Sequence, residues 1–206
     1  MAKSKAMREK TKETCIQHCI QYSINHDQLL LGDSHVERLT WKFQHLKPKN
    51  TWLCGVGGDR ISQLSWRIQN DDLLGYTQNT QITGSFTTIG IMIGTNDIQM
   101  KLMSTSQLMK LVDRVKLIKS MVENRWIESK IIIFPIPPMN CDMEMECQKN
   151  IQLFNSLLYS EGLINLCWPK LDLDLDFEDQ LHLTENGYMK WFDMLRSAGF
   201  RIEFDL

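Results

Sequence analysis

Short apolar runs alternate with helical patterns along most of this chain. Four runs are nearly continuous in apolar residues and are candidate strands: 28–31, 51–54, 88–93 and 130–134. The last of them, "KIIIF", contains the kind of β-branched run that is buried on both faces of a parallel sheet. Each run is followed by apolar residues at three- and four-residue spacing, and this spacing predicts an amphipathic helix after each strand.

The alternation continues to the end of the chain. Apolar residues at helical spacing surround Phe154, a fifth short apolar run covers Leu163–Cys167, and a final helix is predicted over Gly187–Leu195. Strands that alternate with helices need crossover connections, which place helices on both faces of a parallel sheet. The predicted fold class is therefore α/β: a three-layer α/β/α sandwich with a flavodoxin-like, five-stranded parallel sheet.

The length of the chain suits one domain preceded by a short extension. Its 206 residues can bury one substantial core. The first twelve residues carry five basic side chains and one acidic side chain, which is typical of a solvated tail or the start of an exposed helix. We therefore predict a basic N-terminal extension over residues 1–25, extended or helical, and one domain over residues 26–206. The extension could contact an acidic partner such as nucleic acid.

Composition and charge exclude several classes of protein. Apolar residues at 43% and charged residues at 23% are ordinary for a folded domain, and the net charge of -2 gives no overall nucleic-acid signature. No apolar run approaches the roughly 18 residues of a membrane-spanning helix, and the polar N-terminus lacks the apolar centre of a secretory signal. We expect an intracellular, cytoplasmic protein. Its scattered cysteines are then expected to be free thiols: Cys15, Cys19, Cys54, Cys141, Cys147 and Cys167.

Four short polar motifs are candidates for chemistry. They are "GDSH" (32–35), "GVGGD" (55–59), "GTND" (94–97) and "DQLH" (179–182). Ligands of open α/β sheets bind beyond the carboxyl ends of the strands. Ser34, Gly58 and Asn96 each follow a predicted strand directly, so we expect all three to converge at that edge.

Ser34 is a candidate nucleophile. A serine hydroxyl needs a base within hydrogen-bond reach, and the base must be oriented by a third group. His182 is the natural base, and Asp179 lies three residues before it, so one tight loop can hold carboxylate and imidazole together. Simpler interpretations stay open, because Ser34 could be an N-cap and "DQLH" could be a turn before a helix capped by Thr184.

The same motifs offer donors for a developing negative charge. A tetrahedral intermediate needs preorganised hydrogen-bond donors around its oxyanion. The N–H groups of Ser34 and Gly58 and the side-chain amide of Asn96 are the candidates, with Asp33 and Gly57 in supporting positions. Each of these residues could also serve only in a turn or a helix cap.

Taken in this order and spacing, the four motifs resemble the conserved blocks of the SGNH hydrolase superfamily, the GDSL-type esterases and lipases. The second block with its continuation, "GVGGDRISQLSWRI", is most similar to the intracellular platelet-activating-factor acetylhydrolase branch. The resemblance implies a serine esterase for a small or short-chain acyl ester, with Gly58 and Asn96 in the oxyanion hole. His35 stands where the founding motif has leucine, and this departure leaves the substrate preference open.

Two other functions stay open at this point. One is a non-catalytic SGNH-like module that binds nucleic acid or protein, and the other is a carbohydrate O-deacetylase, which differs only in the leaving group. The serine mechanism requires no cofactor and no metal. We interpret "CIQHC" (15–19) as a helix face and "LDLDLDFED" (171–179) as an edge segment, although either could contribute metal ligands. The methionine-rich stretch 137–147 is either an acyl-binding element or a surface loop.

Overall fold

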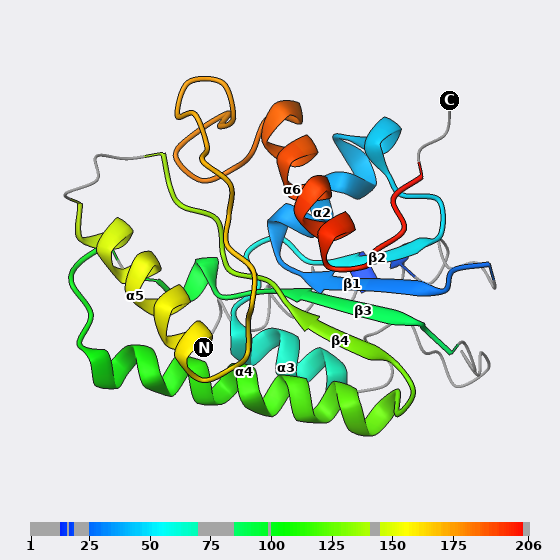
Figure 1. The fold of residues 1–206 in the computed structure, drawn as a ribbon, viewed down its shortest axis with the longest axis horizontal. Helices are drawn as coiled ribbons and strands as arrows, with labels where there is room; N and C mark the ends of the chain where they lie inside the picture. The colour runs from blue at the N-terminus through cyan, green and yellow to red at the C-terminus, as the bar shows by residue number, and fades with distance from the viewer. Residues whose placement is uncertain are drawn as a thin grey trace.

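The centre of the protein is a parallel sheet. A computed structural model describes residues 13–15, 17–18, 25–69, 85–98, 100–140 and 145–203. The described strands are β1 (Gln28–Gly32), β2 (Thr51–Gly55), β3 (Thr88–Met92) and β4 (Lys130–Ile133). They are all parallel, in the order β2-β1-β3-β4 (Figure 1). Gly32 is paired with both Gly55 and Met92, so the three neighbouring strands end at the same level.

Helices cover both faces of the sheet. They are α2 (Ser34–Trp41), α3 (Ile61–Gln69), α4 (Thr105–Arg125), α5 (Glu146–Ser160) and α6 (Glu185–Ser197). Helices α2 and α6 lie on one face, and α3, α4 and α5 lie on the other (Figure 1). The predicted α/β class, with a parallel sheet between two helical layers, is confirmed.

Alternate residues of each strand supply the two cores. Leu29 and Leu31 pack with the apolar faces of α3 and α4, whereas Leu30 between them packs with α2 and α6. All five residues of β1 are buried, because the strand is central and helices cover both of its sides. This explains why the strands read as continuous apolar runs rather than as alternating ones.

The prediction of a fifth strand is wrong. Residues 163–170 are irregular and form no ladder with β4 in the described part of the chain. Ile164 packs into the core beside α5, whereas Leu166 and Trp168 pack against the core beneath α6. Trp168 Nε1 also donates to the carbonyl of Pro135, at 2.8 Å. The alternating apolar side chains therefore cover the edges of both cores without backbone pairing.

Residues 171–179 form a turn, and the expectation of an edge segment is also wrong. Asp172 Oδ1 accepts from the N–H groups of Asp174 and Leu175, at 3.0 Å each. Asp176 is buried, and its carboxylate accepts from Asp172 N–H and pairs with Lys190. The aspartates thus serve the local backbone and one lysine. Across the described residues, no group of three or more His, Cys, Asp or Glu side chains could hold a metal ion.

The remaining expectations concern the cysteines and the N-terminus. Cys167 is a free, exposed thiol, and Cys15, Cys54 and Cys147 are buried. Cys19 and Cys141 lie outside the described residues, as does most of the predicted extension over 1–25, so the domain boundary stays a prediction. Among the helices that the structure describes, none combines the length and the hydropathy needed to cross a membrane.

Gly55 lets the end of β2 approach the start of α2. A Cβ on Gly55 would lie 2.2 Å from the backbone nitrogen of Glu37. We expect Gly55→Ala to lower the free energy of unfolding by about 3 kcal/mol, because neither backbone can move without disturbing the sheet. Urea unfolding followed by circular dichroism measures this loss.

Gly58→Ala is the matched control for this substitution. A Cβ there meets nothing within 4 Å, and only the positive φ of 82° is unfavourable. We expect it to cost about 1 kcal/mol. Equal losses for the two variants would show that the contact with Glu37 is not what makes glycine necessary at position 55.

Candidate active site

Ser34 lies where β1 passes into α2. The strand ends at Gly32, and Asp33 is the N-cap of the helix, with its Oδ1 accepting the N–H of His35 at 3.1 Å. As the first helical residue, Ser34 has an N–H group without an acceptor inside the helix. The positive end of the helix dipole lies at the same place. The hydroxyl and the N–H of Ser34 are therefore both available at the carboxyl edge of the sheet.

A loop of residues 176–184 brings His182 and Asp179 to Ser34. His182 Nε2 lies 3.2 Å from Ser34 Oγ, and His182 Nδ1 lies 2.8 Å from Asp179 Oδ2. The second oxygen of Asp179 accepts the N–H groups of Leu181 and His182, at 2.7 Å each. The structure thus brings the hydroxyl, imidazole and carboxylate predicted from the sequence into one hydrogen-bonded line.

Asp179 is ionised in this arrangement. Its partial burial opposes ionisation, but the hydrogen bonds from the His182 ring and from the backbone N–H groups of His182 and Leu181 outweigh burial and lower the pKa of Asp179 to about 2. A carboxylate bonded to Nδ1 fixes the tautomer of His182, because Nδ1 must then carry the proton. Nε2 is consequently left as an acceptor that faces Ser34 Oγ.

Side chains of α2 and of its C-cap residue, Lys42, hold this loop in place. Arg38 and Lys42 both pair with Glu178, the residue before Asp179. These two cations lower the pKa of Glu178, with the Lys42 hydrogen bond as the largest cause. The loop is attached on its other side as well, because Asn140 N–H donates to the carbonyl of Gln180 at 2.8 Å. The loop is therefore anchored both to the helix that begins at Ser34 and to the segment after β4.

Gly58 and Asn96 lie at the ends of the two strands that flank β1. Gly58 is exposed, at the third position of a turn closed by Asp59 N–H donating to Val56 O at 3.1 Å. The N–H of Gly58 donates to no other described residue. Asn96 Nδ2 donates to the carbonyl of Asp59 at 2.9 Å, which uses one of the two N–H bonds of the amide. Gly57, the predicted supporting residue, lies beside Glu37, and a Cβ added to Gly57 would lie 2.4 Å from Glu37 Oε2.

Two titratable groups are buried directly behind Ser34. Burial raises the pKa of Asp33 to about 7, and the nearby carboxylates of Asp59 and Asp97 add to the rise. Burial lowers the pKa of His35 to about 3, with smaller contributions from His182 and Arg38. The rings of His35 and His182 are 5.8 Å apart between centroids. His35 is therefore a neutral ring packed behind the candidate base.

Sequence reasoning missed one residue near the site, Arg67. Its guanidinium is fully buried, pairs with Asp59 and donates to two backbone carbonyls at the ends of β1 and β2. The available signal was a charged residue on the apolar face of a predicted helix, between Leu64 and Ile68. A buried charge at such a position must be paired and hydrogen-bonded.

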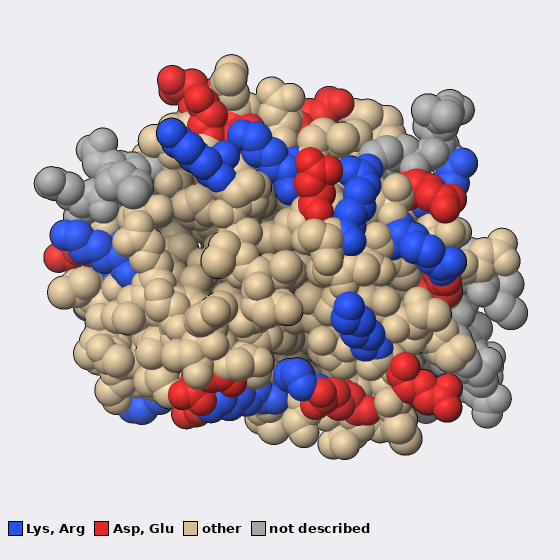
Figure 2. All heavy atoms as spheres, in the orientation of Figure 1, with Lys and Arg blue, Asp and Glu red and all other residues tan. Residues whose placement is uncertain are grey.

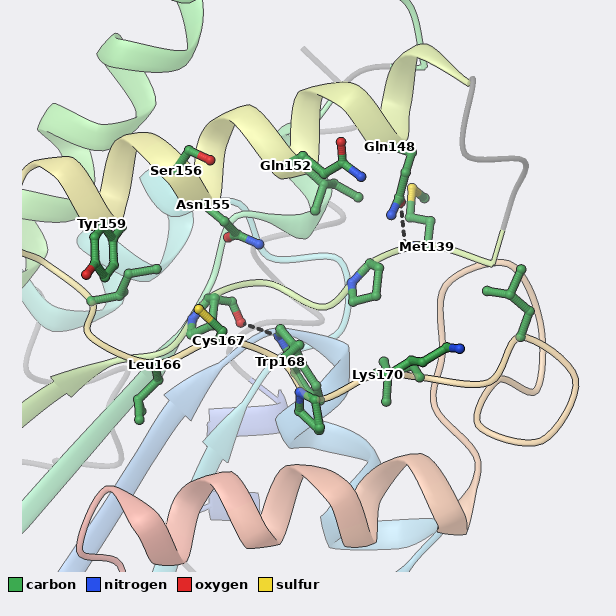
Figure 3. Close-up of a pocket in the computed structure, with 17 residues that line it drawn as sticks. Met139, Gln148, Gln152, Asn155, Ser156, Tyr159, Leu166, Cys167, Trp168 and Lys170 are labelled. Atoms are coloured by element: carbon green, nitrogen blue, oxygen red, sulfur yellow. Dashed lines mark hydrogen bonds between the residues drawn. The ribbon is translucent and has the colours of Figure 1, made fainter.

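A cavity of about 740 Å³ lies between α5, residues 135–139 and residues 164–173. Figure 3 shows Gln152 and Asn155 on the helix side and Cys167, Trp168 and Lys170 on the opposite side. None of the candidate catalytic residues lines it. Met139 of the methionine-rich stretch is part of its wall, whereas residues 141–144 of that stretch lie outside the described residues.

Solved structures of other proteins share the overall fold of this chain. They have the same parallel sheet between two helical layers, at sequence identities below 20%. No protein-family model matches the sequence, and no curated protein matches it either.

Three solved structures illustrate the likeness. A structure from Streptococcus pneumonia described as a platelet activating factor is 17% identical, with a TM-score of 0.67 and coverage of 96% of each chain. A GDSL-like lipase from Bacteroides thetaiotaomicron is 14% identical, with a TM-score of 0.60 and coverage of 91% of this chain and 96% of that one. A member of the lipolytic protein G-D-S-L family from Veillonella parvula is 16% identical, with a TM-score of 0.59 and coverage of 85% of this chain and 98% of that one.

The anchoring of the 176–184 loop generates a prediction for activity. We expect Glu178→Ala to lower about tenfold the rate of any reaction in which His182 activates Ser34, because the loop of His182 and Asp179 loses the ion pairs that hold it over Ser34. Glu161→Ala is the control, since Glu161, the C-cap residue of α5, pairs with Lys116 of α4. Steady-state kinetics of both variants measure the difference. Equal activity of the two variants would remove Glu178 from the description of the site.

The raised pKa of Asp33 generates a prediction for stability. A carboxyl with a folded-state pKa of about 7 and an ordinary value of 3.8 favours the folded state most at low pH, and this contribution is lost as the pH rises through 7. Asp33→Asn keeps the oxygen that accepts from His35 but cannot ionise. We expect the variant to gain stability relative to the wild type between pH 4.5 and pH 8, measured by urea unfolding. Parallel stability curves would show that Asp33 does not titrate in this range.

Proposed function

We propose that this protein is a serine carboxylic ester hydrolase that acts on small or short-chain acyl esters. The observation that carries the proposal is the hydrogen-bonded line from Ser34 Oγ through the His182 ring to Asp179, with distances of 3.2 Å and 2.8 Å. The similar solved structures include a GDSL-like lipase and a member of the lipolytic G-D-S-L family, which supports the same class of reaction.

The first half of the proposed reaction transfers the acyl group to the enzyme. Ser34 Oγ attacks the carbonyl carbon of the ester while His182 Nε2 takes the hydroxyl proton. Asp179 holds the Nδ1 proton and stabilises the imidazolium that forms. When the tetrahedral intermediate collapses, the bond to the leaving oxygen breaks, and His182 delivers its proton to the departing alcohol. The product of this half is an ester between the acyl group and Ser34.

The second half returns the enzyme to its starting state. A water molecule gives a proton to His182 Nε2 and attacks the acyl carbon, and the bond to Ser34 Oγ then breaks as His182 returns the proton to that oxygen. Both halves pass through an intermediate with a negatively charged oxygen. The N–H of Ser34, the N–H of Gly58 and the second N–H of the Asn96 amide are the proposed donors to it.

The surroundings of Ser34 favour a short acyl group. Gly58 and Asp179 are exposed, and Ser34 itself is half-buried, so the proposed reaction centre lies close to the surface of the sheet edge. A short acyl chain needs no deep apolar pocket. Lipid and carbohydrate esters share this chemistry and differ in the leaving alcohol, so a panel of both kinds of ester identifies the natural class.

A nucleic-acid-binding role is the second interpretation that the sequence left open. The basic residues behind it lie in residues 1–12, outside the described part of the chain. On the face shown in Figure 2, lysine and arginine side chains are interspersed with aspartate and glutamate. That mixture gives no support for an electrostatic nucleic-acid surface on this face.

Ser34→Ala tests the proposal directly. We expect the substitution to lower the hydrolysis of p-nitrophenyl acetate and butyrate by at least about a thousandfold, because the covalent step loses its nucleophile. Ser156→Ala is the matched control, since the Ser156 hydroxyl on α5 has no hydrogen bond to any residue that the structure describes, and Ser156 is not one of the candidate site residues. Release of p-nitrophenol measures both variants.

Covalent labelling provides a second readout for the same test. An organophosphonate should add one phosphonyl group to the wild type and to Ser156→Ala, located at Ser34 by mass spectrometry, and should leave Ser34→Ala unmodified. If the wild type neither hydrolyses the esters nor takes the label, the non-catalytic binding module replaces the enzyme as the better interpretation.

A further inference from the structure

We propose that Arg67 is a positioning residue that holds all the proposed oxyanion donors in one rigid unit. The inference rests on the proposed function, since it concerns how the oxyanion hole is built. Arg67 is on α3, behind the sheet edge, and its side chain is fully buried. It touches no substrate position and acts through the groups that do.

The guanidinium joins the ends of two strands to the turn that carries Gly58. Arg67 Nη2 donates to Gly32 O at 3.0 Å, and Nη1 donates to Cys54 O at 3.1 Å. Arg67 Nε pairs with Asp59 Oδ2 at 2.7 Å. Gly32 is two residues before Ser34, and Asp59 directly follows Gly58. The guanidinium group of one side chain therefore holds the backbone before Ser34 and the backbone after Gly58, on the two sides of the proposed oxyanion hole.

The third donor is connected to the same unit. The backbone carbonyl of Asp59 accepts from Asn96 Nδ2 at 2.9 Å, so the residue that pairs with Arg67 also orients the Asn96 amide. The next residue, Asp97, accepts the N–H of Ile61 at 2.8 Å and ties the end of β3 to the start of α3. Displacing Asp59 would therefore move the Gly58 N–H and release the Asn96 side chain together.

Stability alone does not account for this buried ion pair. The desolvation of a guanidinium and a carboxylate offsets much of their attraction, and well-packed apolar residues at such positions are often equally stable or more stable. Apolar residues, however, could not hold the carbonyls of Gly32 and Cys54 and the carboxylate of Asp59 in fixed positions relative to one another. Donors of an oxyanion hole have to lie within about 0.5 Å of their productive positions, and this is the need that Arg67 meets.

Arg67→Lys tests the inference, with Arg125→Lys as the matched control. Lysine keeps the charge next to Asp59 but cannot bond to Gly32, Cys54 and Asp59 at once. We expect kcat to fall on the order of a hundredfold with KM changed less than threefold, because the lost arrangement matters in the transition state. Arg125 donates to Ile68 O at the far end of α3, and its substitution should leave both constants unchanged. An unchanged kcat in a folded Arg67→Lys variant would overturn the inference.

A double substitution separates positioning from general loss of structure. If Arg67 acts through the donors, Arg67→Lys combined with Asn96→Ala should lower kcat by about as much as the stronger single substitution. If the two effects multiply, Arg67 acts independently of the hole and the inference fails. Where Arg67→Lys does not fold, Asp59→Asn takes its place in both experiments, since it weakens the same pair without changing size.

Hydrogen exchange tests the inference without relying on catalysis. In Arg67→Lys, peptides covering 55–60 and 94–97 should exchange faster, whereas peptides of α6 should keep the wild-type rate. A uniform increase across the chain would indicate a merely structural residue and would overturn the inference. If the wild type itself is inert toward esters and organophosphonate, the proposed function fails, and this measurement still decides whether Arg67 holds the two loops.

Discussion

The parallel register of β1, β2 and β3 is the constraint on which the rest of the site depends. Because Gly32 is paired with Gly55 and Met92, three strands from distant parts of the chain end at one level. The residues that follow them are then neighbours, whatever lies between them in sequence. A shift of one residue in either pairing would exchange the side chains that face the two cores, so the packing of both cores fixes this register. The convergence of the polar motifs is thus a by-product of packing the sheet.

His182 and Asp179 reach the site by a different route. In the described structure no strand leads directly into their loop, and side-chain ion pairs help to hold that loop. Glu178 pairs with Arg38 and Lys42, and Tyr188 Oη donates to His35 O at 2.7 Å. The helix that begins at Ser34 therefore also anchors the loop of His182. The candidate oxyanion donors are positioned by the sheet, whereas His182 is positioned by ion pairs that are partly exposed to solvent.

Much of the fold was predictable from local pattern, and particular failures have particular causes. The run "KIIIF" became β4 because a continuous β-branched segment is stable only where both faces are covered. Leu163–Cys167 has a similar apolar content, but its side chains are divided between two cores and it does not pair with β4. Arg67 was overlooked because the sequence shows only a charged residue on an apolar helix face, and a solvated arginine is the ordinary interpretation of that pattern.

The sequence by itself determined the layers of the protein, the strands next to Ser34, Gly58 and Asn96, and the close pairing of Asp179 with His182, because each of these depends on residues near one another in the chain. Only the tertiary structure decided that the His182 ring meets Ser34 across 148 residues, that His35 is a neutral buried ring, and that Arg67 joins the strand ends. The reason is physical: spacing and propensity act over a few residues, whereas the burial of a charge and the direction of a side chain depend on everything that packs around them.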